Sequence, residues 1–139
     1  MNTNSPTPKP KTLSVLVIED NSLVRKVVCQ MLKLNGFNAE SADTGTLGIL
    51  MAEKQDYDCI LSDFGLPDLN GDKIARIIRT YEKKHNKQPT HMVVLSASVD
   101  KEQEALCLAA GIDQVFIKPL NAEIIEHIYA ALRAKQTKT

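Results

Sequence analysis

The chain has 139 residues, of which 43% are hydrophobic and 24% charged, a composition typical of one globular domain with its own core. Lysine plus arginine and aspartate plus glutamate both total 17, so no basic excess indicates direct nucleic-acid binding. No apolar run approaches the roughly 20 residues that cross a bilayer. Residues 1–11 also contain no apolar segment of the kind that a secretory signal needs. We therefore expect a cytoplasmic protein with no membrane contact through this segment.

Three segments are expected from composition along the chain. Residues 1–11 are Asn, Thr, Ser, Pro and Lys after the initial Met, which predicts a disordered leader or linker. Residues 12–135 form one folded domain, and residues 136–139 a disordered tail. Cys29, Cys59 and Cys107 each lie in an apolar run without metal-ligand spacing, so we expect core or half-buried thiols in a reducing compartment.

Apolar runs alternate with helix-periodic segments in the first half of the domain. The run 15–18 is apolar and mostly β-branched, which predicts a strand buried on both faces. Ser22 is placed to cap a following helix, and Gly36 to end it in the left-handed conformation. Residues 37–41 alternate apolar with polar and predict an edge strand, followed by a helix over about 44–54. The positions predicted to face the core are Val24, Val27, Val28, Met31 and Leu32 in the first helix and Leu47, Leu50 and Met51 in the second.

The second half of the domain continues the alternation. Strands are predicted over 57–62, 91–95 and 114–117, with a helix over about 100–110 and a last helix capped by Asn121. Five strand–helix units in series indicate an α/β fold, with a parallel sheet covered by helices on both faces. A third helix, after the turn-rich loop 64–71, carries Ile74, Ile77, Ile78 and Tyr81, and the last helix has Ile124, Ile125, Ile128 and Leu132 on one face.

Polar side chains stand where four of these strands end. Glu19 and Asp20 follow the first strand, Asp63 the third, Ser96 the fourth and Lys118 the fifth. Taken singly, each is more often a turn former, a helix cap or a solvated charge. In an open parallel sheet, however, ligands bind beyond the carboxyl ends of the strands. The joint pattern therefore predicts one site.

The chemistry of this set is coherent. Clustered carboxylates repel one another unless a cation neutralises them, and oxygen ligands beside a phosphate favour Mg²⁺. Asp63 can then act as a carboxylate nucleophile that forms an acyl phosphate. Lys118 would pair with one phosphoryl oxygen, and Ser96 would donate a hydrogen bond to another.

These residues and their neighbours resemble the receiver domains of response regulators and hybrid sensor histidine kinases, over roughly residues 13–134. The matching motifs are Val17-Ile18-Glu19-Asp20-Asn21, Ile60-Leu61-Ser62-Asp63, Leu66-Pro67-Asp68-Leu69-Asn70-Gly71, Leu95-Ser96-Ala97, Ala109-Ala110-Gly111-Ile112-Asp113 and Phe116-Ile117-Lys118-Pro119-Leu120. The resemblance implies a flavodoxin-like (βα)5 fold with strand order 2-1-3-4-5, and a Lys118–Pro119 bond of a kind that is commonly cis.

The resemblance also implies a role for each site residue. Asp63 would be the phosphoacceptor, and Asp20 and Asp63 would bind Mg²⁺ directly. Glu19 would bind it through water, with the backbone carbonyl of Gly65 as a further ligand. The two residues that would contact the phosphoryl group are Ser96 and Lys118.

The resemblance further implies a signalling module, which as a domain is not an enzyme beyond its own phosphorylation and dephosphorylation. Its partner would be a sensor histidine kinase or a histidine phosphotransfer domain. The fourth helix, fifth strand and fifth helix would form the face for a downstream effector. The module could be free-standing, part of a transcription factor, or part of a hybrid kinase, and the segment 109–120 favours the hybrid kinase.

The sequence departs from the family pattern at two positions, and one of them also bears on a rival function. Val115 stands where most receivers carry an aromatic partner of the switch hydroxyl, and the aromatic Phe116 should point to the other face of the strand as a core residue. Gly65 offers no side chain to shield or orient an attacking water. It also offers no acid–base group, which argues against an aspartate-nucleophile phosphohydrolase. A partner-binding pseudo-receiver usually lacks part of the acidic pair, aspartate and lysine, which this chain keeps.

Overall fold

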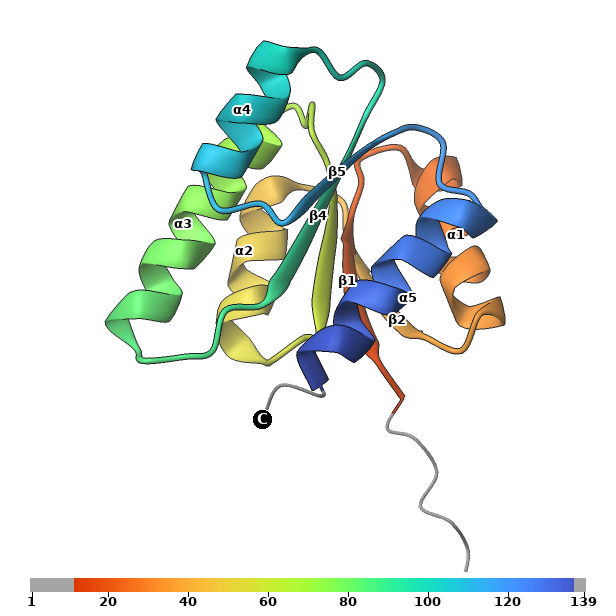
Figure 1. The fold of residues 1–139 in the computed structure, drawn as a ribbon, viewed down its shortest axis with the longest axis horizontal. Helices are drawn as coiled ribbons and strands as arrows, with labels where there is room; N and C mark the ends of the chain where they lie inside the picture. The colour runs from red at the N-terminus through yellow and green to blue at the C-terminus, as the bar shows by residue number, and fades with distance from the viewer. Residues whose placement is uncertain (1–11, 137–139) are drawn as a thin grey trace, which may run out of the picture.

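The computed structural model describes residues 12–136. They form a five-stranded parallel sheet with the strand order β2-β1-β3-β4-β5 and with helices on both faces (Figure 1). The predicted α/β class and strand order are therefore confirmed. The elements are β1 (Ser14–Ile18), α1 (Ser22–Leu34), β2 (Asn38–Ala42), α2 (Gly45–Lys54), β3 (Cys59–Asp63), α3 (Gly71–Lys84), β4 (His91–Ser96), α4 (Lys101–Ala109), β5 (Gln114–Ile117) and α5 (Ala122–Gln136).

The sequence predicts a leader and a tail at the two ends of the chain. The predicted leader, residues 1–11, and residues 137–139 lie outside the described part of the chain. Helix α5 reaches Gln136, the first residue of the predicted tail. Within residues 12–136, no helix is both long and apolar enough to cross a membrane. The cytoplasmic location stays a prediction.

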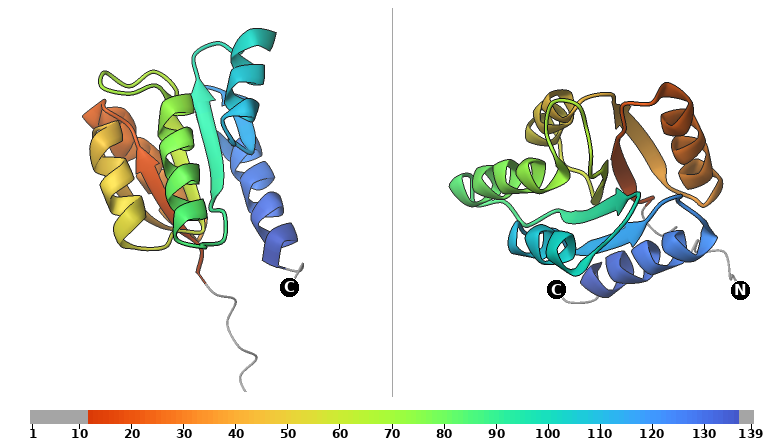
Figure 2. Two further views of the ribbon diagram at one scale, coloured as in Figure 1. Left: turned by 90° about the vertical axis from the view of Figure 1, so that its left-hand side faces the viewer. Right: turned by 90° about the horizontal axis from the view of Figure 1, so that it is seen from above.

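The sheet separates two apolar cores, because successive side chains of a strand point to opposite faces. Val15 and Val17 pack with α1 and α5 on one face, whereas Leu16 and Ile18 pack with α2, α3 and α4 on the other. Figure 2 shows this three-layer arrangement from the side and from above. The apolar run of β1 is buried on both faces, as predicted, and this holds the ends of the central strands in fixed positions.

Several local predictions are confirmed. Strand β2 lies at the sheet edge, and the bounds of β5 are those predicted. Gly36 has φ +89°, in the left-handed region that glycine tolerates best, and the Lys118–Pro119 peptide is cis. The predicted core face of α5 is buried over its full length. Cys59 and Cys107 are buried and Cys29 is half-buried.

Two predictions about helix α2 and the start of α1 are wrong. The cap of α1 is Asn21, whose side chain accepts from the Val24 N–H, and not Ser22, which is the first helical residue. In α2, the predicted core residues Leu47 and Leu50 are 41% and 48% exposed. The buried face of α2 is instead formed by Gly45, Gly48 and Ile49.

Helices α1 and α3 are buried along narrower faces than their apolar residues suggested. In α1, Val28 and Leu32 are buried, Met31 is half-buried, and Val24 and Val27 are exposed. In α3, Ile74 and Ile78 are buried, Tyr81 is half-buried and Ile77 is exposed. The apolar surface that α1 leaves exposed lies directly after the acidic pair of the candidate site.

Candidate functional site

The predicted site residues meet at the carboxyl ends of the parallel strands, the upper end of the sheet in Figure 1. Oxygen atoms of Glu19, Asp20 and Asp63 all lie within 4.8 Å of one another. The three carboxylates come from the ends of β1 and β3, which are neighbours in the sheet. The topology therefore brings the acidic residues into one cluster.

Lys118 supplies the positive charge of the cluster. Its Nζ lies 2.9 Å from Oδ1 of Asp63 and 3.9 Å from Oε1 of Glu19. The backbone after β5 is held in place by the Lys118 N–H, which donates to the Ser96 carbonyl at 2.8 Å. One lysine thus faces two carboxylates, and the cluster as a whole keeps a negative charge.

Glu19 is buried, with 7% of its surface exposed. Its Oε2 accepts a hydrogen bond from the Asn21 N–H at 3.0 Å. Burial raises the pKa of Glu19, and the nearby Asp63 charge raises it further, whereas the Asn21 hydrogen bond and Lys118 lower it. A cation bound between the carboxylates would favour the charged form of Glu19.

The loop after Asp63 is held by a contact with β4 and by contacts within the loop and with Asp63. The Phe64 N–H donates to the Leu95 carbonyl at 2.9 Å, which ties the loop to β4. The Gly65 N–H donates to Oδ1 of Asp63 at 3.3 Å, and Gly65 forms an isolated antiparallel bridge with Asn70. The backbone of Gly65 therefore lies beside the predicted phosphoacceptor.

Asp68, in the same loop, holds the start of α2. Its carboxylate accepts from the N–H of Thr46 at 2.9 Å, from the N–H of Gly45 at 3.0 Å and from the Thr46 hydroxyl at 2.8 Å. These hydrogen bonds lower the pKa of Asp68 to about 2, and the bond from the Thr46 N–H makes the largest contribution. Asp68 belongs to the matched motif, but its contact with α2 was not predicted.

Arg25 is a second residue that the sequence analysis missed. Its Nη1 donates to the Glu19 carbonyl at 2.9 Å and lies 3.4 Å from the Asp20 carbonyl. The guanidinium thus fixes the backbone that carries the acidic pair. A cation in the first turn of the helix after an acidic pair was the available signal.

Ser96 closes β4 and is buried. Its hydroxyl donates to the Ser98 carbonyl at 2.8 Å and accepts from Nε2 of Gln103 at 2.7 Å. The contact with Gln103 was not predicted, because nothing in the sequence pairs it with Ser96.

Val115 and Phe116 of β5 contact opposite cores, as predicted. Phe116 is only half-buried, however, and its ring stacks on that of His127 with 6.0 Å between the ring centroids.

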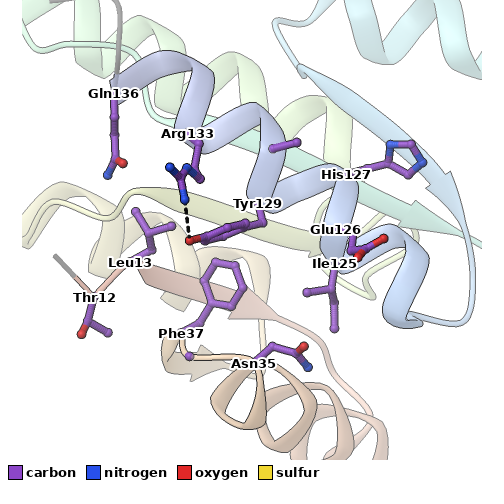
Figure 3. A pocket seen from close by; sticks show the side chains of 12 residues that line it. Thr12, Leu13, Asn35, Phe37, Ile125, Glu126, His127, Tyr129, Arg133 and Gln136 are labelled. Atoms are coloured by element: carbon purple, nitrogen blue, oxygen red, sulfur yellow. Dashed lines mark hydrogen bonds between the residues drawn. The ribbon is translucent and has the colours of Figure 1, made fainter. Parts of the chain in front are cut away.

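An open groove lies in another part of the described surface. Figure 3 shows an open groove of about 920 Å³ between α5, the start of β1 and the turn that joins α1 to β2. Its side chains pack on one another: Tyr129 meets Phe37 edge-on, and Arg133 donates to the Tyr129 hydroxyl at 3.3 Å. None of the predicted site residues lines it. The groove therefore does not contain the site.

Comparison with known families agrees with this geometry. The response regulator receiver domain model matches residues 15–130, so the chain belongs to the response regulator receiver family of two-component signalling. The cell cycle transcriptional regulator CtrA of Caulobacter vibrioides is 34% identical over 122 residues, which are 87% of this chain and 51% of CtrA. The chain thus spans about half the length of the curated relatives that it matches.

Solved structures share the fold. The receiver domain of sensor histidine kinase PA1611 from Pseudomonas aeruginosa, described with a magnesium ion coordinated in its active site cleft, has a TM-score of 0.73 and 29% identity. The match covers 85% of this chain and 94% of that one. The receiver domain of Ssk1, in complex with the phosphotransfer protein Ypd1 of Saccharomyces cerevisiae, has a TM-score of 0.77 and 24% identity, covering 83% of this chain and 84% of that one.

Proposed function

We propose that this receiver domain accepts a phosphoryl group from a phosphohistidine on Asp63. The observation that carries the proposal is the position of Asp63 at the end of β3, inside a carboxylate cluster and 2.9 Å from Lys118. A carboxylate oxygen of Asp63 attacks the phosphorus, the phosphorus–nitrogen bond breaks, and the histidine leaves with its electron pair. The product is an acyl phosphate on Asp63.

Lys118 and Ser96 have separate roles in this proposal. Lys118, which pairs with Asp63 in the resting state, exchanges part of that contact for a phosphoryl oxygen as negative charge arrives. Ser96 donates its hydroxyl hydrogen to a second phosphoryl oxygen. Both act by positioning and neutralising the group that is transferred, which is the main task of a protein in phosphoryl transfer.

The donor set fits Mg²⁺. Glu19, Asp20 and Asp63 offer only oxygen atoms, they lie within 4.8 Å of one another, and one lysine does not balance their charge. Asp20 and Asp63 would hold the ion directly, Glu19 through water, and the Gly65 carbonyl would complete the protein ligands. Such an ion supplies charge neutralisation between the carboxylates and the incoming phosphoryl oxygens.

The phosphohistidine partner is proposed to be a sensor histidine kinase or a histidine phosphotransfer domain that docks beside α1. Leu23 and Val27 are 70% and 50% exposed in the first two turns of α1, directly after the acidic pair, and Ile117 is exposed at the end of β5. Leu23 and Val27 are four residues apart and so share one face of α1, and exposed apolar side chains that gather on one face are typical of a binding surface. The Ssk1 receiver, which has the same fold, is bound to a phosphotransfer protein.

We propose a receiver from a hybrid sensor histidine kinase, with a downstream effector that binds the face of α4, β5 and α5. The relatives include both a kinase receiver and a transcriptional regulator. The length of the full gene product distinguishes these settings from a free-standing receiver.

The phosphoacceptor assignment is tested by intact-protein mass spectrometry after incubation with acetyl phosphate, with and without Mg²⁺. Wild type should gain one phosphoryl group that depends on Mg²⁺ and that fragmentation places on Asp63. Asp63→Asn should remain unlabelled, because an amide is not a nucleophile at neutral pH. Asp56→Asn is the matched control, since Asp56 is exposed before β3 and pairs with Lys87, and it should label as wild type does. Labelling of Asp63→Asn at the wild-type level would refute the assignment.

A further inference from the structure

The Ser96 hydroxyl joins the candidate site to helix α4. Its hydrogen bond from Nε2 of Gln103, at 2.7 Å, connects the end of β4 with the first turn of α4. Ser96 is buried and Gln103 is half-buried, so this bond is shielded from solvent on one side. Strand β4 pairs with β3, and Asp63 is aligned with Leu95, the residue before Ser96. The bond therefore starts beside the proposed phosphoacceptor.

The count of hydrogens fixes the direction of each bond. A serine hydroxyl has one hydrogen, and the Ser98 carbonyl, 2.8 Å away, can only accept it. Gln103 must therefore present its NH₂ group and not its carbonyl to Ser96. Consequently, Ser96 can donate to a phosphoryl oxygen only after it releases Ser98, and that rotation changes its geometry toward Gln103.

The side chain of Val115 cannot hydrogen-bond to the Ser96 hydroxyl. Val115 pairs with Val94 across β4 and β5, and it packs in the core formed with α2, α3 and α4. An aliphatic side chain has no donor or acceptor for the Ser96 hydroxyl. Among the described residues, Gln103 is the side chain that hydrogen-bonds to that hydroxyl.

Gln103 is also part of the cap of α4. Its N–H donates to the carboxylate of the N-cap residue Asp100 at 2.7 Å. A glutamine at this third helical position often turns back to the cap residue itself, but here its amide reaches Ser96. The backbone of Gln103 is thus held by the cap and its side chain by β4, so a change at Ser96 acts on the first turn of the helix.

We propose that Gln103 is the positioning residue that couples Ser96 to α4. The inference rests on the proposed function, namely that Asp63 carries the phosphoryl group. Without phosphate, Gln103 holds the Ser96 hydroxyl toward Ser98. When the Ser96 side chain turns to donate to a phosphoryl oxygen, its hydroxyl oxygen moves away from Nε2 of Gln103, that bond is lost and the first turn of α4 is released.

The first test measures backbone hydrogen exchange in α4 of the unphosphorylated protein. Gln103→Ala and Ser96→Ala should each speed exchange in the first hydrogen-bonded turn of α4 about fivefold, the effect of losing one hydrogen bond. The double variant should exchange no faster than either single variant, because both remove the same bond. Leu108→Ala, which shortens a side chain that is 53% exposed at the other end of α4, is the control and should match wild type in the first turn.

The second test adds acetyl phosphate and Mg²⁺. Phosphorylated wild type should show the same fivefold increase in α4 exchange. Gln103→Ala, compared at the same phosphorylated fraction by mass spectrometry, should show no further increase. The inference would be overturned if α4 of unphosphorylated Gln103→Ala exchanged at the wild-type rate. Additive effects in the double variant would overturn it as well. Absence of labelling in wild type would overturn the proposed function and the phosphate-driven step, whereas a non-additive double variant would still support the link between Ser96 and Gln103.

Discussion

At the scale of single residues, Asp68 shows how the site depends on contacts distant in sequence. It lies five residues after Asp63, and its carboxylate binds the N–H groups of Gly45 and Thr46 at the start of α2. The first N–H groups of a helix have no partner within the helix and carry its positive dipole end, so a carboxylate there is stabilising. Asp68 thus fixes the loop that carries Gly65 against α2.

We expect Asp68→Ala to lower the free energy of unfolding by about 1 kcal/mol at pH 7, as for loss of a helix cap. The pKa of Asp68 falls from 3.8 to about 2 in the folded state. Its contribution is therefore present above about pH 4 and is lost as the pH falls through about 2. Urea unfolding of both proteins should give curves that converge over this range. Asp43→Ala, at an exposed aspartate before the same helix, should lower stability less than Asp68→Ala, and a wild-type advantage as large at pH 2 as at pH 7 would contradict the ionic explanation.

At the scale of elements, the spacing of apolar residues and the positions of turn residues predicted which segments are helices and strands. They did not always predict which face of a helix is buried. In α5 the apolar stripe and the buried face coincide. In α2 they differ, because a count of apolar side chains gives glycine no weight, whereas Gly48 lets the helix lie directly on Ile18 of β1. Arg25 and Gln103 were missed for a related reason: their contacts depend on which strand end lies nearby.

The role of Gly48 can be tested through its fit against Ile18. A Cβ at position 48 would overlap Cδ1 of Ile18 and lie 2.8 Å from its Cγ1. Gly48→Ala should therefore be destabilising by about 1 kcal/mol, since overpacking costs more than alanine gains in helix propensity. Ile18→Val removes Cδ1, so the double variant should be more stable than the sum of the two single effects predicts in urea unfolding. Additive effects would mean that α2 shifts as a whole to accept the new methyl group.

At the scale of the whole molecule, the two cores fix the site from both sides of the sheet. Because all strands are parallel, the sequence alone predicted that Glu19, Asp63 and Lys118 would converge. It could not predict that Glu19 would be buried and share Lys118 with Asp63, since burial depends on the packing of α1 and of the loop after β5. The fold thus holds unbalanced carboxylates together, and part of its stability opposes their repulsion.

Because a bound cation would relieve the repulsion between these carboxylates, we expect Mg²⁺ to stabilise the entire domain. A ligand that binds only the folded state adds about 1.4 kcal/mol at ten times its dissociation constant, which raises the Tm of a domain of this size by about 4 °C. Thermal unfolding followed by circular dichroism should show this rise for wild type in MgCl₂, relative to NaCl of equal ionic strength. Asp20→Asn should lose most of the rise, because it removes a ligand of the cluster, whereas Asp56→Asn should retain it. An equal rise in wild type and Asp20→Asn would place the bound cation outside the carboxylate cluster.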